Sequence, residues 1–260
     1  PAMISIKTLI KGTTELIKKD TIILAPCLIG SAISYLLIKT QKATMLTPKE
    51  VPFSIWMIMG IIIGIQCLAY TLTLISSQQL LQKKEIQLWD TVKKSIQIFP
   101  KLIAMLILLA IFMTGVGFSL NILQSISLPL ITPVFKIISS IAFIAAIIGF
   151  LICLETFPLF LILKNQPITQ SIKSACKLIY NEPKSILLLN ALIINLKLLV
   201  GLLGSLANQI PILGEGALLI LLDGVCNTYI YVMCLIFLEE VQKQDKSTVE
   251  ILEKNHDLPD

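Results

Sequence analysis

The chain has 260 residues, of which 55% are hydrophobic and only 14% are charged, and its mean hydropathy is +0.86. Soluble domains carry about 25% charged residues, so this composition indicates a chain whose solvent is largely a lipid bilayer. The net charge is +5, and all 21 basic residues are lysine. The lack of arginine excludes bidentate guanidinium recognition of phosphate. We also find no dense basic face with stacking aromatic residues, which argues against nucleic-acid binding.

Six apolar stretches are long enough to cross a membrane as helices, for which about 20 residues are needed. They cover residues 21–38, 52–77, 102–124, 137–163, 185–207 and 216–238. The sequence therefore predicts an all-α polytopic membrane protein with six transmembrane helices. Residues 1–240 form a single transmembrane domain in this prediction, and residues 241–260 form a polar C-terminal tail.

The distribution of lysine predicts the orientation of these spans. Lysines gather in segments 3–20, 78–101 and 164–184, whereas connections 121–135 and 208–215 contain none. Connection 39–50 has three lysines and runs against this trend. Because cytoplasmic loops of membrane proteins are enriched in lysine, we expect a multi-pass protein of the bacterial inner membrane with both termini in the cytoplasm.

Each lysine-rich segment also has the periodicity of an amphipathic helix. The segments end near Asp20, Pro100 and Asn181, which lie about 80 residues apart. This period predicts three repeats, at about 3–77, 78–163 and 164–238, each made of an amphipathic interfacial helix and a helical hairpin. The predicted apolar faces hold Ile6, Leu9, Ile10, Thr13, Leu16 and Ile17; then Leu88, Trp89, Val92, Ile96 and Phe99; then Ile168, Ile172, Cys176 and Ile179.

Two interpretations of these amphipathic segments are open. They form a collar on the membrane surface, with Lys93, Lys94, Lys173 and Lys177 facing anionic lipids. Alternatively, they are cytosolic extensions of the spans that pack on each other.

Two segments carry a resemblance to a known group. They are ITQSIKSACKLIYNEPKSILLLNALI, residues 168–193, and IPILGEGALLILLDGVCNTYIYVMCLIFLEE, residues 210–240. Together they resemble the YciC-like and glycerophosphodiesterase membrane-domain group of bacterial six-span proteins. The resemblance implies a six-span fold and a membrane role, but no particular chemistry.

Three ionisable residues lie well inside predicted spans: Glu155, Lys197 and Asp223. At about 1.5 Å per helical residue, Lys197 lies about 20 Å from Lys184 on the cytosolic side, and Asp223 lies about 12 Å from Glu215 on the outer side. In a core about 30 Å thick, the two groups reach nearly the same depth. We therefore predict that Lys197 faces Asp223.

Glu155 has no evident cation in the sequence, so we expect a neutral carboxyl group hydrogen-bonded to Asn227 or Gln66. One interpretation of these polar residues is a pathway in which Glu155 relays protons or ions. The other is structural, with a Lys197–Asp223 clamp and a polar layer around a protonated Glu155.

The remaining expectations follow from motifs that the sequence lacks. No HExxH, GxSxG or phosphate-binding loop is present, so no catalytic residue is assigned and we expect a non-enzymatic protein. The six cysteines and the single histidine show no metal-ligand spacing, so no metal or cofactor is expected and the cysteines are interpreted as reduced, mostly buried side chains.

The expected function is envelope or lipid homeostasis or membrane scaffolding. The alternative is a transporter or channel for small solutes or lipids; a protein partner or homo-oligomer is left open.

Overall fold

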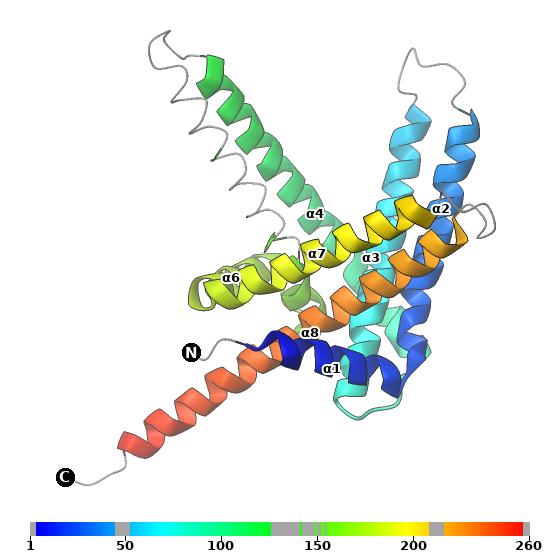
Figure 1. Ribbon diagram of the computed structural model, residues 1–260. Coiled ribbons are helices and arrows are strands. Elements are labelled where there is room, and N and C mark those ends of the chain that lie inside the picture. Colours follow the sequence, from blue (N-terminus) through cyan, green and yellow to red (C-terminus); the bar gives the residue numbers. More distant parts are fainter. Residues whose placement is uncertain are drawn as a thin grey trace. The chain divides into compact units, whose positions relative to one another are not determined.

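A computed structural model describes residues 4–44, 53–125, 141, 149, 152–153, 155–207 and 216–256. All regular structure in these residues is helical (Figure 1), which confirms the all-α prediction for the described part of the chain. The helices are α1 (Ile6–Lys19), η1 (Thr21–Leu24), α2 (Ala25–Thr44), α3 (Phe53–Leu81), α4 (Leu88–Ser125), α6 (Ile168–Asn181), α7 (Pro183–Ala207) and α8 (Ala217–His256).

Five helices in the described part of the chain are long and apolar enough to cross a membrane. They cover Thr21–Thr40, Met57–Leu81, Leu88–Ser119, Pro183–Leu206 and Ala217–Gln244. Each overlaps one of the six predicted spans, which supports a multi-pass membrane protein. The remaining predicted span, 137–163, falls largely outside the described residues, although residues 155–163 are helical.

The chain forms two compact units. The first contains Pro1–Phe99 and Glu182–Asp260, and the second contains Pro100–Asn181. The unit boundaries fall at Pro100 and Asn181, the positions at which the sequence predicts the entry into a span. The units do not coincide with the predicted repeats. The second unit combines the hairpin predicted for the second repeat with the amphipathic segment predicted for the third.

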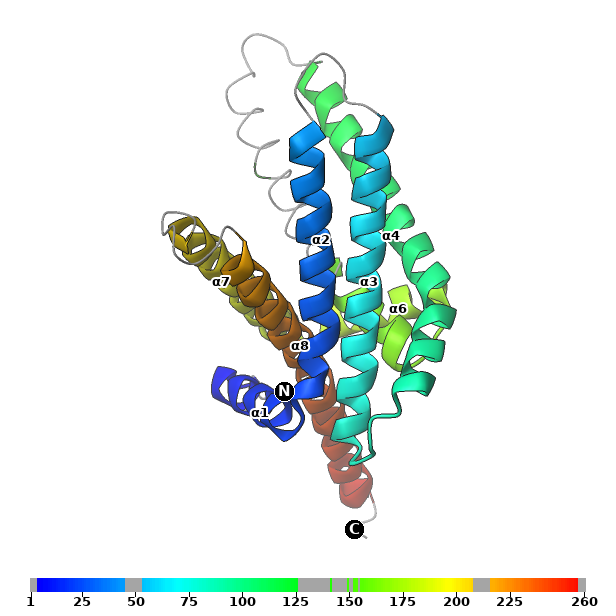
Figure 2. The same cartoon turned by 90° about the vertical axis from the view of Figure 1, so that its right-hand side faces the viewer.

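Helix α8 is central to the first unit. It contacts α1, α2, α3 and α7, and Figure 2 shows α2 and α3 running side by side as a hairpin. The core of α8 is apolar and fully enclosed, with side chains such as Ile230, Met233 and Phe237 at most 1% exposed. α8 also continues to His256, so a helix extends through most of the tail that was predicted from residue 241.

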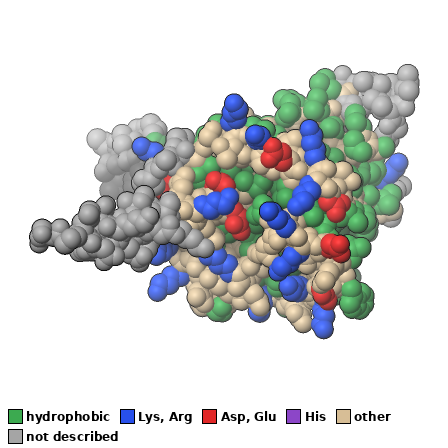
Figure 3. Space-filling model, turned by 90° about the horizontal axis from the view of Figure 1, so that it is seen from below, with side chains coloured by type: hydrophobic (Ala, Val, Ile, Leu, Met, Phe, Trp, Pro, Cys, Tyr) green, Lys and Arg blue, Asp and Glu red, His purple; other side chains and the backbone are tan. Residues whose placement is uncertain are grey.

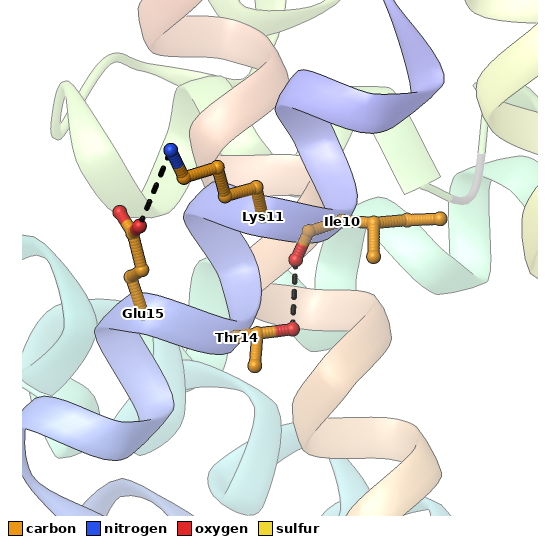
Figure 4. Close-up of polar contacts among 4 residues, drawn as sticks. All are labelled: Ile10, Lys11, Thr14 and Glu15. Atoms are coloured by element: carbon orange, nitrogen blue, oxygen red, sulfur yellow. Dashed lines mark hydrogen bonds and ion pairs between the residues drawn. The ribbon is translucent and has the colours of Figure 1, made fainter.

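Helix α1 is held against α8 and leads directly into the first span. Its buried stripe is Leu9, Thr13 and Leu16, while Lys11 and Glu15 form an exposed ion pair on its surface (Figure 4). At its end, Lys19 donates a hydrogen bond to the Leu80 carbonyl at 3.2 Å, which stabilises the carbonyl end of α3.

Asp20 makes the turn from α1 into the membrane. Its carboxylate accepts a hydrogen bond from the Ile22 amide at 3.0 Å, which caps the short η1 helix. Pro26 then lies in the first turn of α2, where a missing amide donor is tolerated because that turn has no intrahelical partner for it.

The repeat prediction makes the second amphipathic segment a helix of its own, whereas the structure has one continuous helix, as in the alternative of an extension of the span. The segment is the first part of α4, which continues through Pro100 to Ser125. Proline removes one backbone hydrogen bond from a helix, yet membrane helices tolerate this loss where neighbouring groups compensate. The beginning of α4 is tied to α3, because the Gln79 amide oxygen accepts hydrogen bonds from the Gln87 amide at 3.3 Å and the Thr91 hydroxyl at 3.2 Å.

Candidate functional site

A cavity of about 490 Å³ with a mixed apolar and polar lining lies between α2, α7 and α8 in the first unit. Its residues recur at helical spacing on each wall, so one face of each helix contributes to it. The lining residues are Ser31, Ser34, Tyr35 and Ile38 of α2; Lys197, Val200 and Gly201 of α7; and Leu219, Ile220, Asp223, Cys226 and Asn227 of α8. The cavity is thus built from three helices that are each apolar enough to span a membrane.

Asp223 is held in place by a residue of α2. The Ser31 hydroxyl donates a hydrogen bond of 2.6 Å to the Asp223 carboxylate, which lies half-buried on α8. Close approach of the two helices makes this bond possible. A Cβ atom at Gly224 would lie 2.8 Å from the Leu28 Cα atom, so only glycine allows α2 and α8 to cross at this distance.

Lys197 lines the cavity from α7 and is exposed rather than enclosed by protein. Its helix also approaches α8 closely, since a Cβ atom at Gly204 would collide with the Leu219 side chain. Lys197, Asp223 and Asn227 therefore line one cavity. Similar depths were predicted for Lys197 and Asp223, whereas Asn227 was predicted near Glu155. Direct pairing of Lys197 with Asp223 stays a prediction.

Gln66 is connected to the same cavity through α2. Its side-chain amide donates a hydrogen bond of 3.0 Å to the hydroxyl of Ser34, a lining residue. Tyr35, the next residue on this wall, lies close to Gly216, where a Cβ atom would collide with the tyrosine ring. Gly216 has φ of +102°, a conformation that glycine adopts readily, and it forms the start of α8.

Glu155 belongs to the other compact unit, where it lies half-buried on the helical residues 155–163. Its predicted hydrogen bond to Asn227 or Gln66 therefore joins the two units and stays a prediction. Of the residues that the sequence singled out, Lys197, Asp223 and Asn227 line the described cavity, whereas Glu155 lies in the other unit.

Three residues of α2 were missed by sequence reasoning: Ser31, Ser34 and Tyr35. The pattern that could have revealed them is SAISY, in which the two serines and the tyrosine recur at i, i+3 and i+4 within an apolar span. Such spacing places polar groups on one helix face. Their distance from Asp223 along the chain gave no reason to connect them with it.

The beginning of α4 exposes the face that the sequence predicted to be apolar. Trp89 is 80% exposed and Ile96 is 61% exposed, whereas the small polar residues Thr91 and Ser95 are 1% exposed. This is the reverse of the usual arrangement for a water-soluble helix. Lys93 and Lys94 are exposed on the same segment, so it combines apolar and basic groups as interfacial helices do.

Helix α6 buries a different face from the predicted one. Ser171, Ala175 and Leu178 are its buried residues, while the predicted face residue Cys176 is exposed. Small residues are favoured where helices pack closely, and a count of hydrophobic residues alone does not detect them. The predicted apolar face of Ile168, Ile172, Cys176 and Ile179 is half-buried or exposed, as is the predicted face at the beginning of α4.

Lys173 and Lys177 lie on the exposed side of α6. Together with Thr169, Gln170 and Ser174, they line a shallow surface hollow of about 510 Å³. On the described surface seen from below, lysine and acidic side chains are interspersed with hydrophobic ones (Figure 3). The described surface in this view is therefore a mixture of basic, acidic and hydrophobic side chains.

The six cysteines are free thiols. Cys27, Cys67, Cys226 and Cys234 are buried, and Cys153 is partly buried, which confirms the interpretation that most of them are buried side chains. Among the described residues, no group of three or more His, Cys, Asp or Glu side chains is arranged to hold a metal ion.

Comparisons with protein-family models, with curated proteins and with solved structures find no match to this chain.

Proposed function

We propose that this chain is a non-enzymatic, multi-pass membrane protein that binds a small polar molecule or a lipid headgroup in the cavity between α2, α7 and α8. The observation that supports this proposal is the presence of Lys197 and Asp223 in one hollow formed by membrane-spanning helices. Ionisable residues are expensive at this depth and usually mark functional sites. A volume of about 490 Å³ also lies within the range of about 300–1,000 Å³ for small-molecule sites.

This proposal places the protein in lipid homeostasis or in the transport of lipids or small solutes. It includes membership in the YciC-like group, for which residues 168–193 and 210–240 are the support. The competing function is a membrane scaffold, in which Lys197 and Asp223 only clamp α7 to α8. The hydrogen bond from Ser31 to Asp223 favours this second candidate, since it also joins α2 to the pair.

Cysteine labelling distinguishes a usable cavity from a closed clamp. Ser34→Cys, in a background with the six native cysteines changed to alanine, is expected to react with a small water-soluble thiosulfonate. Gly201→Leu should slow this reaction, because Gly201 lines the cavity and a Cβ atom there meets no atom within 4 Å. Gly60→Leu is the matched control, since Gly60 also has open space around it but does not line the cavity. An unreactive Ser34→Cys would support the scaffold.

We further propose that the protein lies in a bacterial inner membrane with both termini in the cytoplasm. The support is the lysine content of the segments that join the spans. Lys94→Cys and Lys173→Cys, each in the same cysteine-free background, are expected to resist a membrane-impermeant maleimide in intact cells and to react after permeabilisation. Labelling of either residue from outside would reverse the orientation.

Anionic lipids are the proposed partners of the basic interfacial segments. Lys173 and Lys177 both border the hollow on α6, and a lysine near an anionic surface contributes about 1 kcal/mol. Changing both to glutamate in the full-length protein should therefore weaken the retention of phosphatidylglycerol by about 2 kcal/mol or more. Native mass spectrometry of the detergent-extracted protein measures this retention, with Lys83→Glu and Lys84→Glu as a charge-matched control in the loop after α3. Equal retention in both variants would favour cytosolic packing of α6.

A further inference from the structure

We propose that the ligand of the cavity is a zwitterion with a primary ammonium group and a phosphate or carboxylate group, an inference that rests on the proposed function. Among the described lining residues, Lys197 and Asp223 are charged and the others are neutral. The cavity therefore carries one positive and one negative group, and its formal charge is zero.

The charge balance of the cavity selects the class of ligand. An ion that moves from water into a site between apolar helices loses part of its hydration, and this loss is recovered when an opposite charge meets it. A single anion would be attracted by Lys197 but repelled by Asp223, and a single cation would experience the reverse. A zwitterion offers its anion to Lys197 and its ammonium to Asp223, so each charge obtains a partner and the net charge stays zero.

The hydrogen-bonding groups around the two charges fit such a ligand. Asp223 accepts one hydrogen bond from Ser31, and a carboxylate has room for further donors such as ammonium N–H groups. One helical turn after Asp223, Asn227 lines the same wall and offers both a donor and an acceptor. Lys197 is exposed on α7 and lines the cavity, so a phosphate or carboxylate oxygen in the cavity can contact its ammonium group.

The same chemistry is available from two sources, a water-soluble zwitterion and the headgroup of phosphatidylethanolamine. Apolar side chains of α2, α7 and α8 complete the lining, namely Ile38, Val200, Leu219 and Ile220. These residues are compatible with either source, because they offer contact to a short linker as well as to the first part of an acyl chain.

The experiment titrates the purified full-length protein with matched probes and follows its thermal stability. Glycerophosphoethanolamine, a phosphodiester with one negative and one positive charge, is compared with dimethyl phosphate and with ethanolamine, which each carry one of these two charges. Dihexanoylphosphatidylethanolamine is compared with dihexanoylphosphatidylglycerol, which lacks the ammonium group. We expect at least one zwitterion to bind about tenfold more tightly than its single-charge counterparts. Binding of both zwitterions would assign recognition to the headgroup alone, and binding of the lipid only would assign the site to phospholipid.

Two variants locate the bound zwitterion. Asp223→Asn keeps the side-chain shape and an oxygen that accepts the Ser31 hydrogen bond, but it removes the negative charge. We expect it to abolish the preference for the zwitterion and to leave the binding of dimethyl phosphate equal or stronger. Gly201→Leu keeps both charges and should weaken the binding of every probe, because the leucine side chain fills part of the cavity.

Two results would overturn the inference. One is equal affinity for zwitterions and single-charge probes, and the other is a preference that survives Asp223→Asn. If no probe binds although Ser34→Cys reacts in the labelling experiment, the zwitterion is wrong and an open cavity remains. If Ser34→Cys is also unreactive, the proposed binding function of the cavity is wrong as well.

Discussion

Replacing Lys197 by methionine is expected to destabilise the detergent-extracted protein by about 2–3 kcal/mol, since an unpaired charge inside a membrane helix costs about 2.5–3.5 kcal/mol. The remaining carboxylate of Asp223 is half-buried and hydrogen-bonded to Ser31, which offsets part of this cost. Asp223→Leu should have the smaller effect, because Lys197 is exposed and a long lysine side chain can reach a more polar region.

The double variant decides whether the two residues are coupled. If they pair, Lys197→Met together with Asp223→Leu should recover much of the loss, because replacing both members of an ion pair with apolar residues is often nearly neutral. Thermal unfolding of the two single variants and the double variant measures the coupling energy. Strictly additive losses would show that Lys197 and Asp223 do not interact. A stable double variant that fails to support cell growth would assign the pair a function beyond clamping the helices.

Gly224→Ala is expected to destabilise the protein by about 1–3 kcal/mol, the usual cost of inserting a methyl group into a well-packed contact. The new Cβ atom would lie 2.8 Å from the Leu28 Cα atom and 3.1 Å from the Leu28 nitrogen. These are backbone atoms, so α2 has to move away from α8 as a whole. The movement should also break the hydrogen bond from Ser31, one turn further along α2, to Asp223.

Gly60→Ala is the matched control for this prediction. Gly60 lies within α3, and a Cβ atom there would meet no atom within 4 Å. Alanine has a higher helix propensity than glycine by about 1 kcal/mol, so this substitution should be neutral or slightly stabilising. Comparison of the melting temperatures of the two variants tests the close crossing of α2 and α8. Equal responses at Gly60 and Gly224 would mean that this crossing does not need glycine.

The amphipathic segments show where periodicity alone is insufficient. Hydrophobic spacing placed Leu88, Trp89, Val92 and Ile96 on one face, and the structure leaves that face exposed while Thr91 and Ser95 are buried. In water, an apolar face turns toward the protein. At a membrane interface it turns toward lipid, and small polar residues form the helix contact instead. The sequence pattern identifies which apolar residues share one helix face, but not whether that face contacts protein or lipid.

The site shows the same division between local and long-range information. Depth along a helix follows from counting residues at about 1.5 Å each, so the sequence predicts similar heights for Lys197 and Asp223. Rotation about the helix axis and the choice of neighbouring helix do not follow from counting. For that reason, the hydrogen bond from Gln66 to Ser34 could not be predicted.

The sequence by itself determined the helical class and the locations of five long apolar helices, because both depend on local composition and on the length needed to cross a bilayer. Only the tertiary structure brought Ser31 to Asp223, which are 192 residues apart in the chain. That contact depends on the glycine at position 224, which lets α2 approach the backbone of α8. Close approach of two helices is a property of the pair, so no single stretch of sequence specifies which polar side chains share a cavity.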